Sequence, residues 1–129
     1  MQLNKSKTRP ATFKNEQLNR EFELNGFVVV SLLNQEEISA LNTAYQANLF
    51  NNPEGFYSTS FSENEGLKLK LNSGINDIVN PKANAIFEPF KALGSCYLSK
   101  APGAVGQMPI HQDWTVIDES LFDSITIWI

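Results

Sequence analysis

One histidine and one aspartate near the end of the chain carry the clearest chemical signal in this sequence. His111 is the only histidine among the 129 residues, and Asp113 follows it two positions later. Side chains two positions apart on a β-strand point to the same face, so a strand here would bring the imidazole and the carboxylate together. Two such groups make up two thirds of the 2-His-1-carboxylate set that holds non-haem Fe(II) and leaves coordination positions open.

The same pair also has a purely structural explanation. A lone histidine can be a buried residue that is hydrogen-bonded to Asp113 or to the backbone. The sequence contains no second histidine that could complete the set of three ligands. Both interpretations stay open on the spacing alone, because 14 of the 129 residues are Asp or Glu and one of them easily falls beside a histidine by chance.

The segments that flank the pair favour the iron-site interpretation. Residues 98–103 read L-S-K-A-P-G, residues 106–114 carry H-Q-D-W, and residues 123–129 read D-S-I-T-I-W-I. In this order the three segments resemble the phytanoyl-CoA dioxygenase family of Fe(II)/2-oxoglutarate oxygenases. Residues 23–30, E-L-N-G-F-V-V-V, and the helix expected after them are similar to the opening of that family. The resemblance covers about residues 14 to 129 and only the N-terminal half of the family.

The resemblance implies a set of ligands and a chemistry. His111 and Asp113 match the first two iron ligands, with Fe(II) as the metal and 2-oxoglutarate as the co-substrate. The family's second histidine and its 2-oxoglutarate-binding arginine have no counterpart here, because both positions lie beyond residue 129. The resemblance also implies co-substrate contacts from Lys100, Gln107, Thr126 and Trp128. Plain alternatives are a solvated Lys100 and a Trp128 in the barrel core. No residue is expected to act as a catalytic acid, base or nucleophile.

The expected fold class is α+β, with N-terminal helices packed on an incomplete double-stranded β-helix of the jelly-roll or cupin-like kind. We expect residues 1–12 to form a flexible tail and residues 13–129 a single domain. Within that domain, residues 13–93 are expected to be a mainly helical buttress with one early strand. Residues 94–129 are expected to hold the first strands of the barrel, at about 94–100, 106–113 and 124–129.

Local signals predict individual helix ends. A helical pattern begins near Phe13, and Gly26 suits the residue that follows its last turn. Asn34 and Glu37 have the spacing of a capping box, which predicts the start of a second helix. Its apolar stripe, made of Ile38, Leu41, Tyr45 and Leu49, is expected to pack on a strand at residues 27–30 that is buried on both faces.

The middle of the chain gives weaker signals. Apolar and polar side chains alternate loosely over residues 56–71. This pattern is typical of a hairpin or a lid over an active site as well as of an ordinary surface excursion. Residues 72–93 contain helical fragments, and Pro81 and Pro89 are expected to prevent one long helix.

Composition excludes several classes of protein. The net charge of -4 and the sequence pI near 4.9 argue against a nucleic-acid binder. No run approaches the roughly 18 apolar residues of a membrane span. Cys96 is the only cysteine, so an internal disulfide is excluded and a cytoplasmic location is expected, with Cys96 as a small core residue.

The expected function is the N-terminal portion of a dioxygenase that hydroxylates a small organic substrate. With two ligands only, this chain is expected to be inactive alone. The apolar run at its end predicts a truncated or split protein whose edge strand pairs with a second copy or with the missing C-terminal half. The alternatives are a non-catalytic α+β interaction module, one half of a two-chain assembly, or a cupin-like metal- or sugar-binding barrel.

Overall fold

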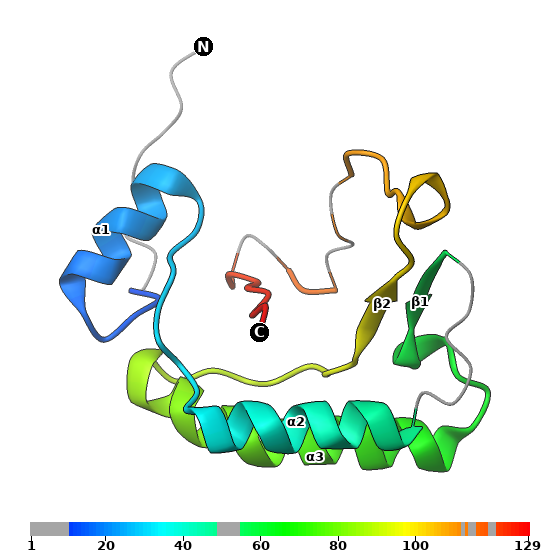
Figure 1. The fold of residues 1–129 in the computed structure, drawn as a ribbon. Coiled ribbons are helices and arrows are strands. Elements are labelled where there is room, and N and C mark those ends of the chain that lie inside the picture. Colours follow the sequence, from blue (N-terminus) through cyan, green and yellow to red (C-terminus); the bar gives the residue numbers. More distant parts are fainter. Residues whose placement is uncertain (1–10, 49–54, 112, 114–115, 119–120) are drawn as a thin grey trace.

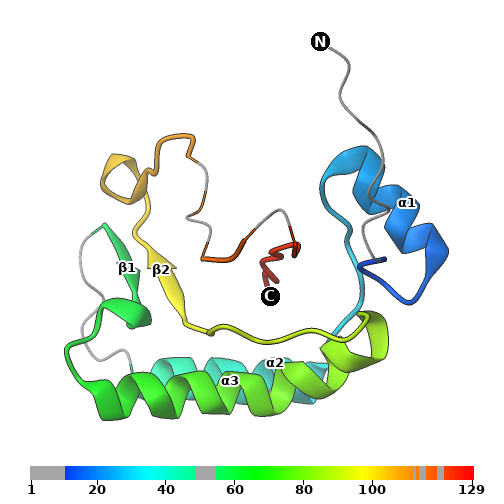
Figure 2. The same cartoon turned by 180° about the vertical axis from the view of Figure 1, so that it is seen from behind.

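The computed structural model describes residues 11–48, 55–111, 113, 116–118 and 121–129. In chain order the elements are α1 (Glu16–Asn25), α2 (Gln35–Asn48), β1 (Phe56–Ser58), the 3-10 helix η1 (Thr59–Phe61), α3 (Glu65–Ile86), β2 (Leu98–Lys100) and the 3-10 helix η2 (Ala104–Gly106). Helices α2 and α3 lie side by side, α1 stands at one end of them and the antiparallel pair of β1 and β2 at the other (Figure 1). The view from behind shows the same open arrangement (Figure 2). The chain is therefore a mixture of helix and strand, as predicted.

Helix α1 ends where the sequence predicts, but it begins at Glu16, three residues after the expected Phe13. The Asn15 side chain accepts hydrogen bonds from the backbone N–H groups of Gln17 and Leu18, which have no partners inside the helix. At the other end, Gly26 has φ 78 and its N–H donates to the carbonyl of Phe22. Glycine adopts this left-handed conformation without a steric penalty, so the helix stops there.

Helix α2 opens with the predicted capping box. The Asn34 N–H donates to the Glu37 carboxylate at 2.8 Å, and the Glu37 N–H donates to the Asn34 side chain at 2.9 Å. Glu37 also forms an ion pair with Lys82 of α3 at 2.7 Å. Because the Lys82 ammonium and the Asn34 N–H both donate to it, the pKa of the Glu37 carboxyl is lowered. This side chain therefore caps one helix and ties it to the next.

The core lies between α2 and α3, and this differs from the prediction. Leu41 of α2 packs with Ile75 and Val79 of α3, and half-buried side chains surround the three: Leu32, Leu33, Ile78 and Tyr97. The prediction that the α2 stripe packs on a strand at residues 27–30 is wrong, since Ile38 of that stripe is exposed. Leu49 and residues 1–10 of the expected tail lie outside the described residues.

The long helix α3 contradicts the prediction that Pro81 interrupts it. The helix runs through Pro81 to Ile86. A proline inside a helix costs about 3 kcal/mol, because it removes one N–H and crowds the carbonyl four residues earlier. Leu71, Ile75, Val79 and Ala83 are buried at four-residue spacing on both sides of the proline. Each large apolar side chain contributes about 1.5–3 kcal/mol when buried, so the packing against α2 outweighs the break.

The sheet is much smaller than predicted. In the described part of the chain it consists of β1 and β2, paired antiparallel. Residues 27–30 and 124–129 are not strands, and neither are the described residues of 106–113, which are 106–111 and 113. Strand β2 covers only part of the expected 94–100, and the excursion at 56–71 contains β1, η1 and the start of α3. A strand is stable only when its backbone groups find partners in a neighbouring strand. The structure places no neighbour beside these segments within its described residues.

Side-chain hydrogen bonds of Ser95 and Tyr97 help to hold the chain between α3 and β2. Ser95 donates its N–H to the Asn72 side chain at 2.7 Å and its hydroxyl to the Asn76 side chain at 2.6 Å. The Tyr97 hydroxyl donates to the carbonyl of Leu41 at 3.0 Å, and burial raises the pKa of this phenol. These bonds fix the entry to β2. Cys96, expected in the core, is instead exposed.

No helix in the described ranges combines the length and the apolar character that a membrane span requires.

Candidate metal centre

The turn that leads to His111 is tightly packed. The Ala101 N–H donates to the carbonyl of Gly55 at 2.7 Å, which joins this turn to the start of β1. Gly106 is buried, and a Cβ atom on it would overlap the carbonyl oxygen of Ala101. Gly103 has φ 82, a conformation that L side chains rarely adopt. No role for Gly106 follows from the predicted strand, although the two glycines of P-G-A-V-G are a turn signal in the sequence.

His111 and Asp113 lie together, although their segment is not a strand. The imidazole Nε2 is 3.4 Å from the Asp113 Oδ1. The His111 side chain is 46% exposed and that of Asp113 is 68% exposed. Both groups are therefore accessible to a dissolved ion, and neither is buried.

A backbone carbonyl orients the imidazole. The His111 Nδ1 is 2.8 Å from the carbonyl oxygen of Pro109. A carbonyl oxygen can only accept, so Nδ1 carries the proton and donates it. In the neutral ring the lone pair is then on Nε2, which faces the carboxylate. Metal-binding histidines are held in this way, with the second ring nitrogen donating to a carbonyl or carboxylate.

The spacing of the two donor atoms fits a shared divalent metal ion. Nitrogen and oxygen ligands of zinc lie about 2.0–2.2 Å from the ion, so two ligands at bond angles between about 90° and about 109° are about 3.0–3.4 Å apart. The observed separation of 3.4 Å is at the upper end of this range. An imidazole nitrogen that faces a carboxylate needs a positive partner between the two, and either a proton on Nε2 or a metal ion provides it.

The ligand set is incomplete. Among the residues that the structure describes, no group of three or more His, Cys, Asp and Glu side chains could hold a metal ion. Two ligands compete poorly with water, and selection of Fe(II) over ions later in the Irving–Williams order depends on geometry and ligand type. The pair alone therefore does not make a metal site, and further ligands would have to join it.

The four side chains expected at the co-substrate are all exposed. The Lys100 ammonium lies 5.9 Å from the centre of the Phe56 ring, its partner in the β1–β2 register. Gln107 is exposed just after η2, and Thr126 is exposed near the end of the chain. Trp128 is 69% exposed, so it is not a core residue of this chain. Within the described residues no hydrogen bond or ion pair joins any of the four to His111 or Asp113.

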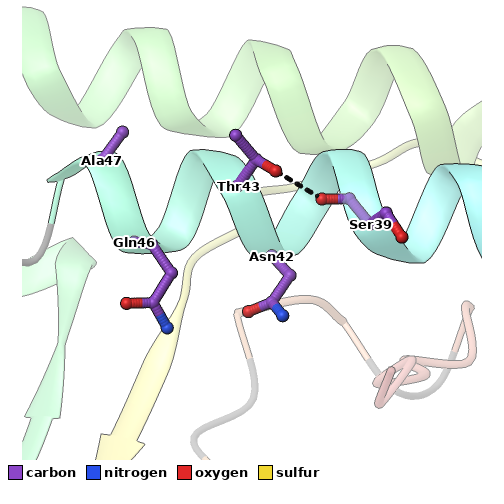
Figure 3. A pocket seen from close by; sticks show the side chains of 5 residues that line it. All are labelled: Ser39, Asn42, Thr43, Gln46 and Ala47. Carbon is purple, nitrogen blue, oxygen red and sulfur yellow. Dashed lines mark hydrogen bonds between the residues drawn. The ribbon is translucent and has the colours of Figure 1, made fainter.

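A shallow depression on α2 offers no comparable chemistry. It is lined by Ser39, Asn42, Thr43, Gln46 and Ala47. Figure 3 shows the amides of Asn42 and Gln46, one turn apart, pointing in the same direction. The Thr43 hydroxyl donates to the carbonyl of Ser39 at 2.8 Å. None of these side chains titrates near neutral pH or binds metals strongly, so the depression is not a candidate for acid–base or metal chemistry.

Comparisons of the chain with models of protein families, with curated proteins and with solved structures each return no match. The assignment of the site therefore rests on two observations from the chain itself. One is the order of the sequence motifs around His111, and the other is the geometry of its side chain relative to Asp113 and Pro109.

Proposed function

We propose that this chain is the N-terminal portion of an Fe(II)- and 2-oxoglutarate-dependent dioxygenase of the phytanoyl-CoA dioxygenase type. The observation that carries the proposal is the approach of the His111 Nε2 to the Asp113 Oδ1 at 3.4 Å, with Nδ1 held by the Pro109 carbonyl. This arrangement supports a metal centre because it presents two exposed, oriented ligands of the types that Fe(II) accepts.

The proposed complete fold is a jelly-roll in which the apolar segments of this chain become strands. Residues 27–30 and 125–129 are rich in β-branched and aromatic side chains, which favour strands, and large side chains in both segments are exposed. Inside a completed barrel these side chains would be buried and their backbone groups paired. The single cysteine supports a reducing, cytoplasmic environment.

In the proposed enzyme each residue has a limited task. His111 and Asp113 bind the metal, and the Pro109 carbonyl holds the imidazole in the tautomer that leaves Nε2 free. Lys100, Gln107, Thr126 and Trp128 would approach 2-oxoglutarate only after the barrel is complete. When bound, Fe(II) and 2-oxoglutarate supply the chemistry that hydroxylates a small organic substrate and converts the keto acid to succinate. Because one histidine and one carboxylate are too few ligands, we expect no turnover from this chain alone.

Proton NMR tests the metal-binding part of the proposal directly. Since His111 is the only histidine, the imidazole proton signals of the untagged chain belong to it without ambiguity. Substoichiometric Mn(II), a paramagnetic stand-in for Fe(II), should broaden these signals. The broadening should weaken at least about tenfold in Asp113→Asn, because a two-ligand site then has one ligand. The matched control Asp77→Asn removes an exposed carboxylate on α3 and should behave as the unchanged chain.

Two results would contradict the proposal or one of its parts. Equal broadening in the unchanged chain and in Asp113→Asn would show that the two side chains do not bind a metal together. Succinate formation well above background from the chain, Fe(II) and 2-oxoglutarate would show that no further ligands are needed.

A further inference from the structure

Asn25 and Gly26, at the end of α1, form the only Asn–Gly pair in the sequence. The side chain of an asparagine that precedes glycine can react with the backbone nitrogen of that glycine, because glycine has no side chain to obstruct the approach. Here both residues are exposed, and a Cβ atom built on Gly26 would meet nothing within 4 Å. The pair therefore has the composition and the open surroundings that this reaction needs.

The side-chain amide of Asn25 is not held in place. No described residue forms a hydrogen bond with it. Asn15 and Asn34 instead cap helices with their side-chain oxygens, and Asn72 accepts a backbone N–H at 2.7 Å. The Asn25 side chain can thus turn its Cγ toward the Gly26 nitrogen without losing a hydrogen bond.

The last turn of α1 blocks the reaction while the helix is closed. The Gly26 N–H donates to the carbonyl of Phe22 at 2.8 Å. For the attack, the Gly26 nitrogen has to lose this proton and face the Cγ of Asn25, and the hydrogen bond opposes both changes. The reaction therefore takes place from a state in which this hydrogen bond is open.

This end of the helix is weakly held. No residue of α1 is buried, and Leu24 is 84% exposed. The contacts that anchor α1 come earlier in the helix: the Asn19 side chain accepts the Phe13 N–H at 2.9 Å, and the Phe22 ring packs edge-on against the Phe13 ring. In both views the end of α1 lies on the side away from α2 and α3 (Figures 1 and 2). Helix ends with few buried contacts open at a low cost in free energy.

We propose that Asn25 is a site of spontaneous deamidation, with water as the co-reactant, and that opening of the last turn of α1 sets its rate. The Gly26 nitrogen bonds to the Cγ of Asn25, the Cγ–Nδ2 bond breaks, and the amide nitrogen leaves as ammonia with the proton from Gly26. Water then opens the succinimide ring at either carbonyl, which yields aspartate or isoaspartate. No group is oxidised or reduced. This inference does not depend on the metal centre.

The products would loosen the end of α1. Each places a carboxylate at the C-terminus of the helix, where the helix dipole is negative, and the last turn contains no basic residue to offset the charge. Isoaspartate also inserts a CH2 group into the main chain, which moves the Gly26 N–H away from the Phe22 carbonyl. Because the lost amide is not restored, deamidation acts as a one-way switch on the connection between α1 and α2.

Mass spectrometry of the full chain after prolonged incubation at neutral pH tests the proposal. Cleavage after glutamate releases residues 24–36 as one peptide, which carries Asn25 and, as an internal control, Asn34. The peptide should gain the difference in mass between water and ammonia, and fragmentation should locate the change at Asn25 as a mixture of aspartate and isoaspartate. Asn34 caps α2 and precedes Gln35, so it should stay unchanged.

Hydrogen exchange tests the control of the reaction by α1. Both exchange and deamidation need a free Gly26 N–H, so folding should slow deamidation, relative to the chain in urea, by the protection factor of the Gly26 amide to within about threefold. In urea, where α1 is unfolded, Gly26→Ala should slow deamidation at least about tenfold, because the added methyl group hinders the attack. Asn25→Gln would have to close a larger ring and should give no product.

Any of three outcomes overturns the proposal. The first is a rate at Asn25 in the folded chain that departs from the value set by the protection of the Gly26 amide. The second is a product that contains aspartate only, as direct hydrolysis of the side-chain amide would give. The third is deamidation of Asn34 as fast as that of Asn25.

Discussion

The contact between α2 and α3 should dominate the stability of this chain, and Ile75→Ala measures it. Ile75 is buried against Leu41 and Val79 in the middle of α3. The substitution removes three carbon groups, which at about 0.8 kcal/mol each gives about 2.4 kcal/mol of lost burial. A residual cavity adds to this cost, and the better helix propensity of alanine returns a few tenths of a kcal/mol. We expect the free energy of unfolding to fall by about 2–3 kcal/mol.

Urea unfolding followed by far-UV circular dichroism provides the assay, because α1, α2 and α3 supply most of the regular structure. Leu69→Ala is the matched control, since Leu69 lies on the same helix but is exposed. It should change the free energy of unfolding by no more than about 0.5 kcal/mol. A loss below about 1 kcal/mol for Ile75→Ala, or equal losses for both variants, would refute the view that the α2–α3 packing holds the fold together.

Further perturbations test the helix ends and the links between helices. The donor groups around Glu37, foremost Lys82, lower the pKa of its carboxyl below 4.5. The ionised carboxylate therefore stabilises the fold above pH 4.5, and this stabilisation is lost as the pH falls through the lowered pKa. Urea midpoints should therefore drop more on acidification for the unchanged chain than for Glu37→Gln, and parallel curves would contradict this. Tyr97→Phe removes a hydrogen bond to α2 and should cost about 0.5–1.5 kcal/mol of unfolding free energy. Since burial raises its pKa, the Tyr97 phenol should ionise above pH 10.0 in an absorbance titration. Gly26→Ala forces φ 78 on alanine and should lower the free energy of unfolding by about 1–2 kcal/mol. Gly74 lies inside α3 with free space around it, so Gly74→Ala should raise the free energy of unfolding by about 0.5–1 kcal/mol in the same urea assay.

The features that the sequence predicted correctly depend on residues close together in the chain. Gly26 ends α1 because its backbone adopts a conformation that other residues avoid. Asn34 and Glu37 cap α2 because they lie three positions apart. The approach of His111 to Asp113 likewise needs only a two-residue separation, although the prediction reached it through a strand that is not there.

The features that the sequence predicted wrongly depend on distant neighbours. Pro81 was expected to end a helix by its local cost, but buried side chains lie on both sides of it, and Ile75 and Val79 among them pack against Leu41 of α2, which keeps the helix continuous. Residues 27–30 have the composition of a buried strand, yet they stay unpaired because the described residues contain no strand beside them. Composition describes which contacts a segment prefers, and only the rest of the fold decides whether those contacts exist.

The sequence by itself determined where α1 ends, how α2 begins, and which imidazole and carboxylate can meet, because each follows from backbone geometry over two to four residues. The tertiary structure alone decided that α3 passes through Pro81, that the core lies between two helices, and that Phe27 and Val29 face solvent. The physical reason is that burial depends on surfaces brought together from distant parts of the chain, and no local pattern specifies which surface will be there.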